Sequence, residues 1–488
     1  MSAPAKVVVV GGGVAGLATA WLVRARAAEA GAPLELTVLE ADGVAGGHTR
    51  SDRVDGFLCE HGPNGFLDNE PRTLELVERV GLTSRLRRAR PEAARRYVMR
   101  AARLRELQMS PLRFLGSDAV TLGTKLRMGL EPFVPQRRDG KDESVAEFGT
   151  RRLGAGFAAS LLDPMVSGIF AGDSRTLSLK AAFPKMAELE AEHGGLFRAM
   201  LARGLRARRA AKAAKAAGET RPSPRGGPGG PGGTLHTFPE GMGELTLRLA
   251  SELGAAVRTF APVTAVTRDG ERFGVRVGAE TLAADAVVVA VPAPAAAELV
   301  SALDPRAQAA LAAIPYAGVT VACRGYALEN LDRPLDGFGV LVRRGEPVRA
   351  LGALCSDRIF EGQAPEGARL LRVILGGAQD PGIVELSPDE LEGVVENDLA
   401  TLFGAHGAPR LRQDYSWRRG IAQYTLGHLE RVAEVERLER AATGLYFTGA
   451  AYRGVSVNGC VKDAFAVSER LVRALVAAGA KKGASAAA

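Results

Sequence analysis

The hydrophobic positions near the start of the chain predict a strand, a turn and a helix in direct succession. Residues 7–10 are all valine, a β-branched run typical of a strand buried on both faces of a parallel sheet. Glycines follow, and then an Ala- and Leu-rich segment from Leu17 to about Ala30 that is typical of a helix. A second strand is predicted over residues 34–39, directly before Glu40. This order of elements predicts a parallel α/β sheet.

The glycines of this turn have the spacing of a dinucleotide-binding motif. In Gly11-x-Gly13-x-x-Gly16, the first glycine makes the tight turn, the second lets the backbone approach a pyrophosphate, and the third packs the helix on the strand. The helix N-terminus offers unpaired N–H groups to the phosphates. Glu40 ends the second strand, where a carboxylate binds ribose hydroxyls. The sequence therefore predicts a Rossmann-like domain with a bound dinucleotide.

The remaining apolar segments alternate between helical and strand-like spacing. Helices are predicted over residues 71–80, most of 114–174, 177–209, 245–253, 387–403 and 459–477. Strands are predicted as two short strands within 257–277, and at 283–291, 319–326, 338–342, 350–354, 370–376 and 445–451. Residues 95–111 are predicted to form an extended, hairpin-like piece. The strands between 319 and 376 suggest one antiparallel sheet, which would form the floor of a substrate domain.

These elements predict a mixed α/β (α+β) fold whose domains interleave along the chain. The dinucleotide-binding domain takes residues 1–67, 234–294 and 431–478, and the substrate domain takes 68–110 and 295–430. Residues 111–205 are a mainly helical insertion. Residues 206–233 are basic and rich in Pro and Gly, a composition that cannot bury enough apolar area to offset chain ordering, so we expect a disordered loop. A disordered tail is expected at 479–488.

Charge, apolar content and cysteine spacing limit the classes of protein to which this chain can belong. The net charge of +8 is concentrated between residues 205 and 225, which hold seven basic residues, one acid and no aromatics, so nucleic-acid binding is not expected. No apolar run is long enough to span a membrane, and we expect no signal peptide because the first predicted strand begins within the first ten residues. Four cysteines lie far apart without metal-binding spacing, which favours reduced thiols in the cytoplasm and no metal site. We expect His61 to be a hydrogen-bonded loop residue rather than a base.

Further motifs resemble those of the flavin-dependent, oxygen-using protoporphyrinogen oxidases, a branch of the amine oxidase superfamily. The pair Gly46-Gly47 resembles the loop that flavoproteins of this superfamily lay along FAD, which favours FAD over a nicotinamide cofactor. The resemblance runs from Val7 to about Leu471. It is carried by residues 11–16 with Glu40 and Gly46-Gly47, by 62–67, by 166–173, and by 423–428 together with 449–458.

Carried over residue by residue, the resemblance implies a noncovalently bound FAD. Cys460, the only cysteine late in the chain, falls inside the predicted last helix and not in the loop at the flavin ring. The implied cofactor contacts are Gly11, Gly12, Gly13, Val14, Ala15, Gly16, Glu40, Ala41, Gly46, Gly47, His48, Gly62, Pro63, Asn64, Gly65, Val263, Gly449, Ala450, Val455, Ser456 and Val457.

The resemblance also implies a substrate and a site for it. The expected activity is oxidation of protoporphyrinogen IX to protoporphyrin IX by molecular oxygen, which gives hydrogen peroxide. Arg96 would hold a substrate propionate, and the carbonyl of Gly168 would face the macrocycle. Leu341 and Ile374 would sandwich the ring. The cofactor carries the chemical step, so the protein needs to orient the ring rather than to supply an acid–base pair.

Several alternatives stay open at this point. Oxidation of coproporphyrinogen III to coproporphyrin III needs the same fold. Amine oxidation is less expected because only Trp21 and Trp417 are available for an aromatic cage; carotenoid desaturation is another enzyme alternative. A binding protein like the GDP-dissociation inhibitors would reuse the architecture, but the intact glycine motif and Glu40 argue against it. The sequence leaves open a homodimer, and attachment of the basic segment to the inner face of the cell membrane.

Overall fold

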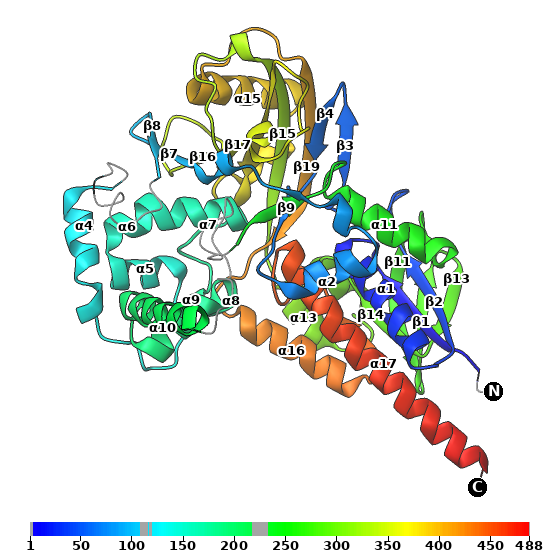
Figure 1. Ribbon diagram of the computed structural model, residues 1–488. Coiled ribbons are helices and arrows are strands. Elements are labelled where there is room, and N and C mark those ends of the chain that lie inside the picture. Colours follow the sequence, from blue (N-terminus) through cyan, green and yellow to red (C-terminus); the bar gives the residue numbers. More distant parts are fainter. Residues whose placement is uncertain (1–2, 108–115, 117–119, 217–232, 488) are drawn as a thin grey trace.

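The computed structural model describes residues 3–107, 116, 120–216 and 233–487 (Figure 1). One part is built on a parallel five-stranded sheet in the order β10-β2-β1-β14-β20. These strands are β1 (Ala5–Val10), β2 (Leu34–Leu39), β10 (Val257–Arg258), β14 (Ala286–Val289) and β20 (Leu445–Phe447). Three distant parts of the chain therefore share one sheet, and the predicted α/β fold class is confirmed.

Alternate valines of β1 pack into two different hydrophobic cores. Val7 and Val9 belong to one core, and Val8 and Val10 belong to the other, because successive side chains of a strand point to opposite faces. The first core is covered by α1 (Val14–Glu29), α2 (Pro71–Arg79), α11 (Gly243–Leu253) and α17 (Val457–Ala487). The second is covered by the antiparallel strands β11 (Val263–Asp269), β12 (Arg272–Val277) and β13 (Glu280–Ala284) and by helices α12 (Ala293–Leu299), α13 (Pro305–Ala312) and α16 (His428–Ala441).

A second, larger sheet has seven strands in the order β19-β15-β18-β17-β16-β7-β8. These are β19 (Leu411–Ala422), β15 (Tyr316–Ala327), β18 (Ala368–Gly376), β17 (Gly352–Cys355), β16 (Gly339–Val342), β7 (Tyr97–Arg100) and β8 (Arg103–Glu106). The predicted hairpin is confirmed as β7 and β8. The strands predicted between residues 319 and 376 pair in antiparallel fashion, as expected, and the β7–β8 hairpin joins them in parallel at β16.

The larger sheet is covered on one face by α15 (Pro388–Phe403). Leu391, Val395 and Leu399 of this helix pack against strand residues such as Leu371 and Val373. The opposite face carries Val319, Val321 and Ile374 in a separate cluster, and this face meets the loops that follow β2. The helix-covered face is therefore structural, and the other face is available to a site.

The chain between β8 and β9 (Leu235–Thr237) forms a lobe of helices, which lies on the left in Figure 1 with α7 next to the larger sheet. The helical lobe consists of α4 (Leu122–Gly129), η3 (Glu131–Phe133), α5 (Val145–Leu153), α6 (Ala155–Phe157), η4 (Ala158–Leu162), α7 (Asp163–Phe170), α8 (Leu179–Ala182), α9 (Pro184–His193) and α10 (Leu196–Ala216). The predicted helical character is confirmed for the described residues. Phe114 and Pro111, which bounded two predicted elements, lie outside them.

Two predictions of disorder are wrong at their boundaries. We expected a loop from residue 206, but α10 continues to Ala216, because Ala, Arg and Lys are strong helix formers whatever their exposure. The expected tail at 479–488 is likewise helical to Ala487, as the end of α17. Residues 217–232 of the predicted loop lie outside the described residues.

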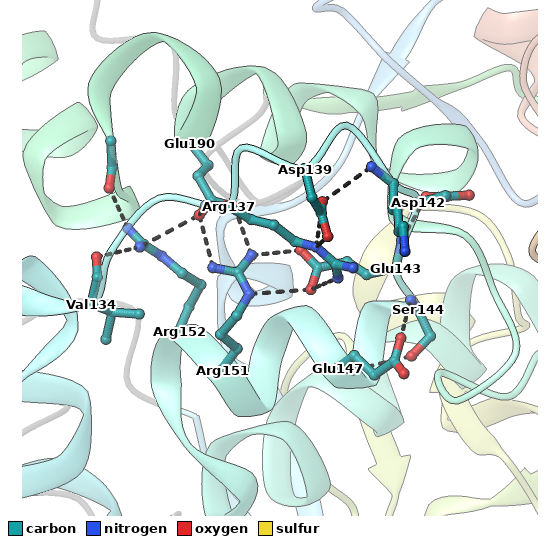
Figure 2. A network of polar contacts seen from close by, with 12 residues as sticks. Val134, Arg137, Asp139, Asp142, Glu143, Ser144, Glu147, Arg151, Arg152 and Glu190 are labelled. Carbon is teal, nitrogen blue, oxygen red and sulfur yellow. Dashed lines mark hydrogen bonds and ion pairs between the residues drawn. The ribbon is translucent and has the colours of Figure 1, made fainter.

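Buried ion pairs hold the helical lobe together (Figure 2). Arg152 and Glu131 form a pair in which both side chains are 0% exposed. The guanidinium of Arg152 also donates to the carbonyls of Val134 and Gly194, both at 2.8 Å. The Glu131 carboxylate accepts from the first N–H groups of α10, those of Leu196 and Phe197. This pair therefore ties η3, α5 and the start of α10 to one another.

The remaining elements are short. They are β3 (Ser51–Val54), β4 (Phe57–Glu60), β5 (Phe66–Leu67), β6 (Arg87–Arg88), α14 (Ser356–Ile359), η1 (Thr83–Arg85), η2 (Pro91–Ala94), η5 (Gly254–Ala256), η6 (Leu328–Asn330), η7 (Gly377–Gln379) and η8 (Pro381–Glu385). In the described part of the chain, no helix has both the length and the apolar composition needed to cross a membrane.

Candidate functional site

The turn after β1 forms a cradle of backbone. A Cβ atom on Gly16 would lie 1.9 Å from the carbonyl oxygen of Gly11, so α1 can pack this closely only with glycine there. Gly11 itself has φ +106°, a conformation that favours glycine. At Gly13 a Cβ would meet nothing within 4 Å, so the second glycine leaves open space. The first and third glycines thus build the turn, and the second leaves room for a ligand at the N-terminus of α1.

The carboxylate of Glu40 is held at the end of β2, next to this cradle. It accepts hydrogen bonds from the backbone N–H of Gly12 at 2.7 Å and of Asp42 at 2.9 Å. The carboxylate therefore has a fixed direction before any ligand arrives. The carboxylate predicted to bind a ribose therefore lies beside the glycine cradle, and Ala41 follows it directly.

The second glycine pair lies directly on the first glycine turn. Gly46 donates from its N–H to the carbonyl of Gly12 at 2.8 Å, and Gly46 also forms a bridge with Gly13. Gly47 approaches so closely that a Cβ there would lie 3.2 Å from the Cα of Gly13. Both glycines have positive φ, +130° and +55°. The two motifs, which are separated in sequence, therefore form one continuous surface.

The C-terminal loop completes this surface. A Cβ on Gly449 would lie 3.8 Å from the Cβ of Ala15, which brings the loop after β20 to the start of α1. The loop then turns at Gly454, with φ +144°, and the Ser456 hydroxyl accepts from the N–H of Gly459 at 3.1 Å to cap α17. Ala450, Val455 and Val457 lie within this same loop and helix start. The N-termini of α1 and α17 thus border one site.

Residues 48–65 extend the site toward the larger sheet. A Cβ on Gly62 would lie 2.3 Å from the carbonyl oxygen of His48, so the segment of Gly62, Pro63, Asn64 and Gly65 runs closely past His48. The His48 ring lies 4.3 Å from the Trp417 ring of β19. Burial, reinforced by the positive charge of Arg50, lowers the pKa of His48 to about 4. His48 is therefore neutral near pH 7.

His61 is a hydrogen-bonded residue of this segment, as expected. Its Nε2 lies 2.8 Å from a carboxylate oxygen of Asp52, and its ring stacks on Tyr415 at 3.8 Å. Val263, which was also expected to contact the cofactor, is the first residue of β11.

An apolar row crosses the open face of the larger sheet. Leu341 lies opposite Gly352, and Gly352 lies opposite Ile374, so the side chains of Leu341 and Ile374 point to the same face. Val98 continues the row beyond Leu341. Gly352 carries no side chain between the leucine and the isoleucine, and a Cβ there would lie 2.7 Å from the carbonyl oxygen of Val340.

Helix α7 covers one end of this row. A Cβ on Gly168 would lie only 2.8 Å from Cδ2 of Leu341, so only glycine lets the helix come this close without displacing the leucine. The next residue, Ile169, is an apolar side chain that is 48% exposed. The structure therefore brings Gly168, Leu341 and Ile374, the residues that the resemblance implied, to the region between α7 and the sheet.

Arg96 lies at the edge of the same face. Its carbonyl accepts from the N–H of Leu107, which extends the β7–β8 ladder, so Arg96 shares the face of Val98. The guanidinium lies 4.8 Å from the centre of the Phe338 ring, and burial lowers the pKa of Arg96. Its neighbour Arg95 is exposed and lies 3.7 Å from Asp336. The two adjacent arginines thus have different surroundings.

Two buried charges near the site escaped the sequence analysis. Arg372 of β18 is almost fully buried and donates to the carbonyl of Gly62. Glu60 is also buried, and desolvation raises the pKa of its carboxyl to about 7, although hydrogen bonds from Ser51 and Met242 oppose this. The sequence does hold a signal for Arg372, because it is the only charged residue in the otherwise apolar segment Leu370–Gly376. Charged residues in such strands rarely stay buried without a partner.

Comparisons with known proteins agree with this geometry. The model of the flavin containing amine oxidoreductase family matches residues 14–472. A coproporphyrinogen III oxidase from Propionibacterium freudenreichii subsp. freudenreichii is 35% identical over 96% of this chain and 91% of its own length. A chloroplastic protoporphyrinogen oxidase from Oryza sativa subsp. japonica is 30% identical over 94% of this chain and 86% of its own.

The fold is also that of a solved structure. A crystal structure of a protein from Exiguobacterium sp. 255-15 superposes with a TM-score of 0.80 at 24% identity, covering 97% of this chain and 99% of that one. The family match begins at Val14, the first residue of α1, and ends at Val472 within α17. The chain therefore belongs to the flavin containing amine oxidoreductase family.

Proposed function

We propose that this protein binds FAD noncovalently and oxidises protoporphyrinogen IX to protoporphyrin IX, with molecular oxygen as the final acceptor. The observation that carries the proposal is the apolar row of Leu341, Gly352 and Ile374, covered by α7 at Gly168, with a half-buried arginine at its edge. We take the space between this row and α7 as the proposed substrate slot, because its apolar residues suit a flat, apolar macrocycle with carboxylates on one side. The names of two relatives support the porphyrinogen class.

The residues around the glycine cradle fit FAD. The open space at Gly13 and the N-terminus of α1 suit the pyrophosphate, and the fixed carboxylate of Glu40 suits the adenosine ribose. The N-terminus of α17 suits the pyrimidine end of the flavin, where negative charge develops on reduction. Bound FAD would supply a two-electron acceptor that takes a hydride from a bridge carbon and that oxygen can reoxidise, with release of hydrogen peroxide.

The protein's own residues then have the task of orienting the ring. Leu341 and Ile374 would contact the faces of the macrocycle, and the carbonyl of Gly168 would lie over it. Arg96 would pair with a propionate and so decide which bridge carbon faces the flavin, since a planar guanidinium holds a carboxylate at two points. The loss of six hydrogens in three two-electron steps would leave the aromatic porphyrin.

Coproporphyrinogen III is a second candidate substrate, favoured by the name of the 35% identical bacterial relative. The two molecules differ in charge. Coproporphyrinogen III carries a propionate on each of its four pyrroles, whereas protoporphyrinogen IX carries two, on adjacent pyrroles. The inner part of the row is apolar, at Val98, Leu341 and Ile374, and this favours the substrate with carboxylates at one edge only.

The test is a direct comparison of the two porphyrinogens. Purified protein would be mixed with each one, and porphyrin fluorescence and peroxide would be followed in the presence and absence of oxygen. We expect a kcat/KM for protoporphyrinogen IX at least about tenfold above that for coproporphyrinogen III. The reverse ratio would make coproporphyrinogen III the substrate, and no oxidation of either would overturn the proposal.

We further propose that the protein is cytoplasmic and attaches peripherally to the membrane through the helical lobe. On α4 and the residues that follow it, Leu122, Leu126 and Leu130 recur every four residues and are 71%, 67% and 55% exposed. Phe133 adds an aromatic ring that is 81% exposed. Apolar residues at this spacing form one face, as in helices that lie in the membrane interface.

A further inference from the structure

Gln423 and Tyr424 follow β19 directly. They lie between α7 and the loop that follows β20. The side-chain amide of Gln423 donates to the carbonyl of Phe170 at 2.8 Å. Phe170 is the last residue of α7, where helix carbonyls lack partners within the helix. A Cβ on Gly172 would lie 2.6 Å from Oε1 of Gln423, so the amide also lies flat against the chain that leaves α7. Gln423 therefore holds the C-terminal end of the helix that carries Gly168.

Tyr424 makes the matching contacts on the flavin side. Its hydroxyl donates to the carbonyl of Ala450 and accepts from the N–H of Gly454, both at 2.8 Å. One hydroxyl thus closes the loop between β20 and α17. Burial raises the pKa of Tyr424, so the hydroxyl stays protonated and can donate.

The backbone of the same two residues is fixed on both sides. Gln423 donates from its N–H to the carbonyl of Pro315, and the carbonyl of Tyr424 accepts from the N–H of Ser178, both at 2.8 Å. The Tyr424 ring stacks on His428 at 4.0 Å and lies 5.9 Å from the Phe170 ring. Neither side chain can move without breaking several contacts, so the pair acts as a rigid spacer.

We infer that Gln423 and Tyr424 are positioning residues that hold α7, on the substrate side, at a set distance from residues 449–454, on the flavin side. The inference rests on the proposed function, because those two elements border the slot and the flavin ring only if that proposal is right. Hydride transfer needs reacting atoms about 3–3.5 Å apart, and a misplacement of about 1 Å can lower the rate about 100-fold. Gln423 and Tyr424 are adjacent in the chain, and each is hydrogen-bonded to one of the two elements. They therefore form a short connection between α7 and residues 449–454.

The first test is Tyr424→Phe, which removes the hydroxyl and keeps the ring. We expect the Kd for FAD to rise about tenfold, because two hydrogen bonds to the flavin-side loop are lost. The visible spectrum of the bound flavin should also shift, since the loop that surrounds the pyrimidine end is released. Both readouts are measured on the enzyme without turnover.

The second test is Gln423→Met, which keeps the volume of the side chain and removes the amide. Here the Kd for FAD and the flavin spectrum should stay unchanged, while the rate of flavin reduction by substrate, measured without oxygen, falls about tenfold or more. In the double variant Gln423→Met/Tyr424→Phe, the loss in that rate should differ from the product of the two single losses, because both residues fix one spacing.

Tyr326→Phe is the matched control. Tyr326 is 3% exposed on β15 but points to the α15 face, away from the site. It should change neither the Kd for FAD nor the reduction rate. The inference is overturned if Tyr424→Phe behaves like this control, or if Gln423→Met lowers thermal stability and leaves the reduction rate unchanged. If wild-type protein oxidises neither porphyrinogen, the proposed function fails, and the FAD affinities still decide the role of Tyr424.

Discussion

Arg95 and Arg96 have the same charge but different surroundings. Arg96 is half-buried over Phe338 on the face of the apolar row, whereas Arg95 is exposed beside Asp336. Arg96→Ala should therefore lower kcat/KM for protoporphyrinogen IX about 10- to 100-fold, since a charge-assisted hydrogen bond contributes about 1.5–3 kcal/mol. Steady-state kinetics under air would measure this. Flavin content should be unaffected.

The neighbouring arginine provides the control for this prediction. Arg95→Ala should leave kcat/KM within about twofold of wild type, because a solvent-exposed ion pair contributes little. If the two substitutions exchange their effects, Arg95 is the propionate anchor. If neither lowers kcat/KM, the anchor lies elsewhere in the slot.

His428 makes stability depend on pH in the acid range. It is 0% exposed, and burial lowers its pKa from 6.5 to about 4. Between these values the unfolded chain binds a proton at this ring and the folded chain does not, so the free energy of unfolding falls as the pH falls from 6.5 toward 4. This group contributes a slope of at most about 1.4 kcal/mol per pH unit.

Replacing the ring isolates this contribution. His428→Phe keeps an aromatic partner for Tyr424 and removes the titrating group, so its unfolding midpoint should vary less between pH 6.5 and 4.5 than that of wild type. Urea unfolding at a series of pH values, followed by circular dichroism, measures the slope. Equal slopes in both proteins would show that His428 does not titrate in this range. His48, lowered for the same reason, stays in both proteins and cancels from the comparison.

At the scale of elements, the helical lobe depends on the pair of Arg152 and Glu131. Glu131→Ala would remove the closer of the two carboxylates that pair with the buried guanidinium, leaving Glu190 at 3.5 Å, and would remove the acceptor at the start of α10. We expect a loss of about 3–5 kcal/mol in the free energy of unfolding, the usual cost of breaking a buried pair from one side. Urea denaturation of the apoprotein would measure it. Arg152→Met/Glu131→Leu should recover part of this loss, and a double variant less stable than Glu131→Ala would contradict the argument.

The elements that could be predicted from the sequence are those whose signal is local. The valines of β1, the glycines after it and Glu40 lie within one short segment, and the strand and the turn form where they were predicted. By contrast, β19 was not predicted. Its exposed positions carry polar residues such as Arg412 and Asp414, because β19 is an edge strand that faces solvent on one side. The parallel pairing of β16 with β7 joins segments far apart in the chain, and no local pattern indicates it.

The same distinction applies to the site. The glycine cradle was predicted from spacing, and Arg96, Gly168, Leu341 and Ile374 from resemblance alone. The roles of Gln423 and Tyr424 depend on partners far away in the sequence, at Phe170 and Ala450, and no periodicity in the chain reports such contacts. Residues that connect elements are therefore the part of a site that requires a structure.

At the scale of the whole molecule, the cofactor should be held by contacts from both ends of the chain and by no covalent bond. Cys460 is buried in the first turns of α17, and burial raises its pKa to about 12, so its thiol is a poor nucleophile at neutral pH. Acid precipitation should therefore release all the flavin into the supernatant. A pellet that stays yellow, with flavin still attached after washing, would contradict noncovalent binding.

The helical lobe should determine where the molecule resides. Its exposed leucines on α4 lie in the same lobe as α10 (Figure 1), and α10 exposes Met200, Leu201, Arg206 and Arg209. Apolar side chains would enter the interface while arginines contact anionic headgroups. Wild-type protein should therefore cosediment with vesicles that contain anionic lipid, and less so at high salt.

A substitution on the apolar face tests this directly. Leu122→Asp/Leu126→Asp should weaken vesicle binding by about tenfold or more, since burial of one leucine side chain contributes about 1.5–3 kcal/mol. Specific activity in detergent should stay unchanged, because α4 contributes no residue to the slot. Leu247→Asp replaces a leucine that is also exposed, at 59%, but on α11 outside the lobe, and it should bind vesicles as wild type does. If wild type and both variants bind vesicles equally, α4 is not the attachment surface. If only Leu247→Asp binds less, the attachment surface lies on the dinucleotide-binding domain.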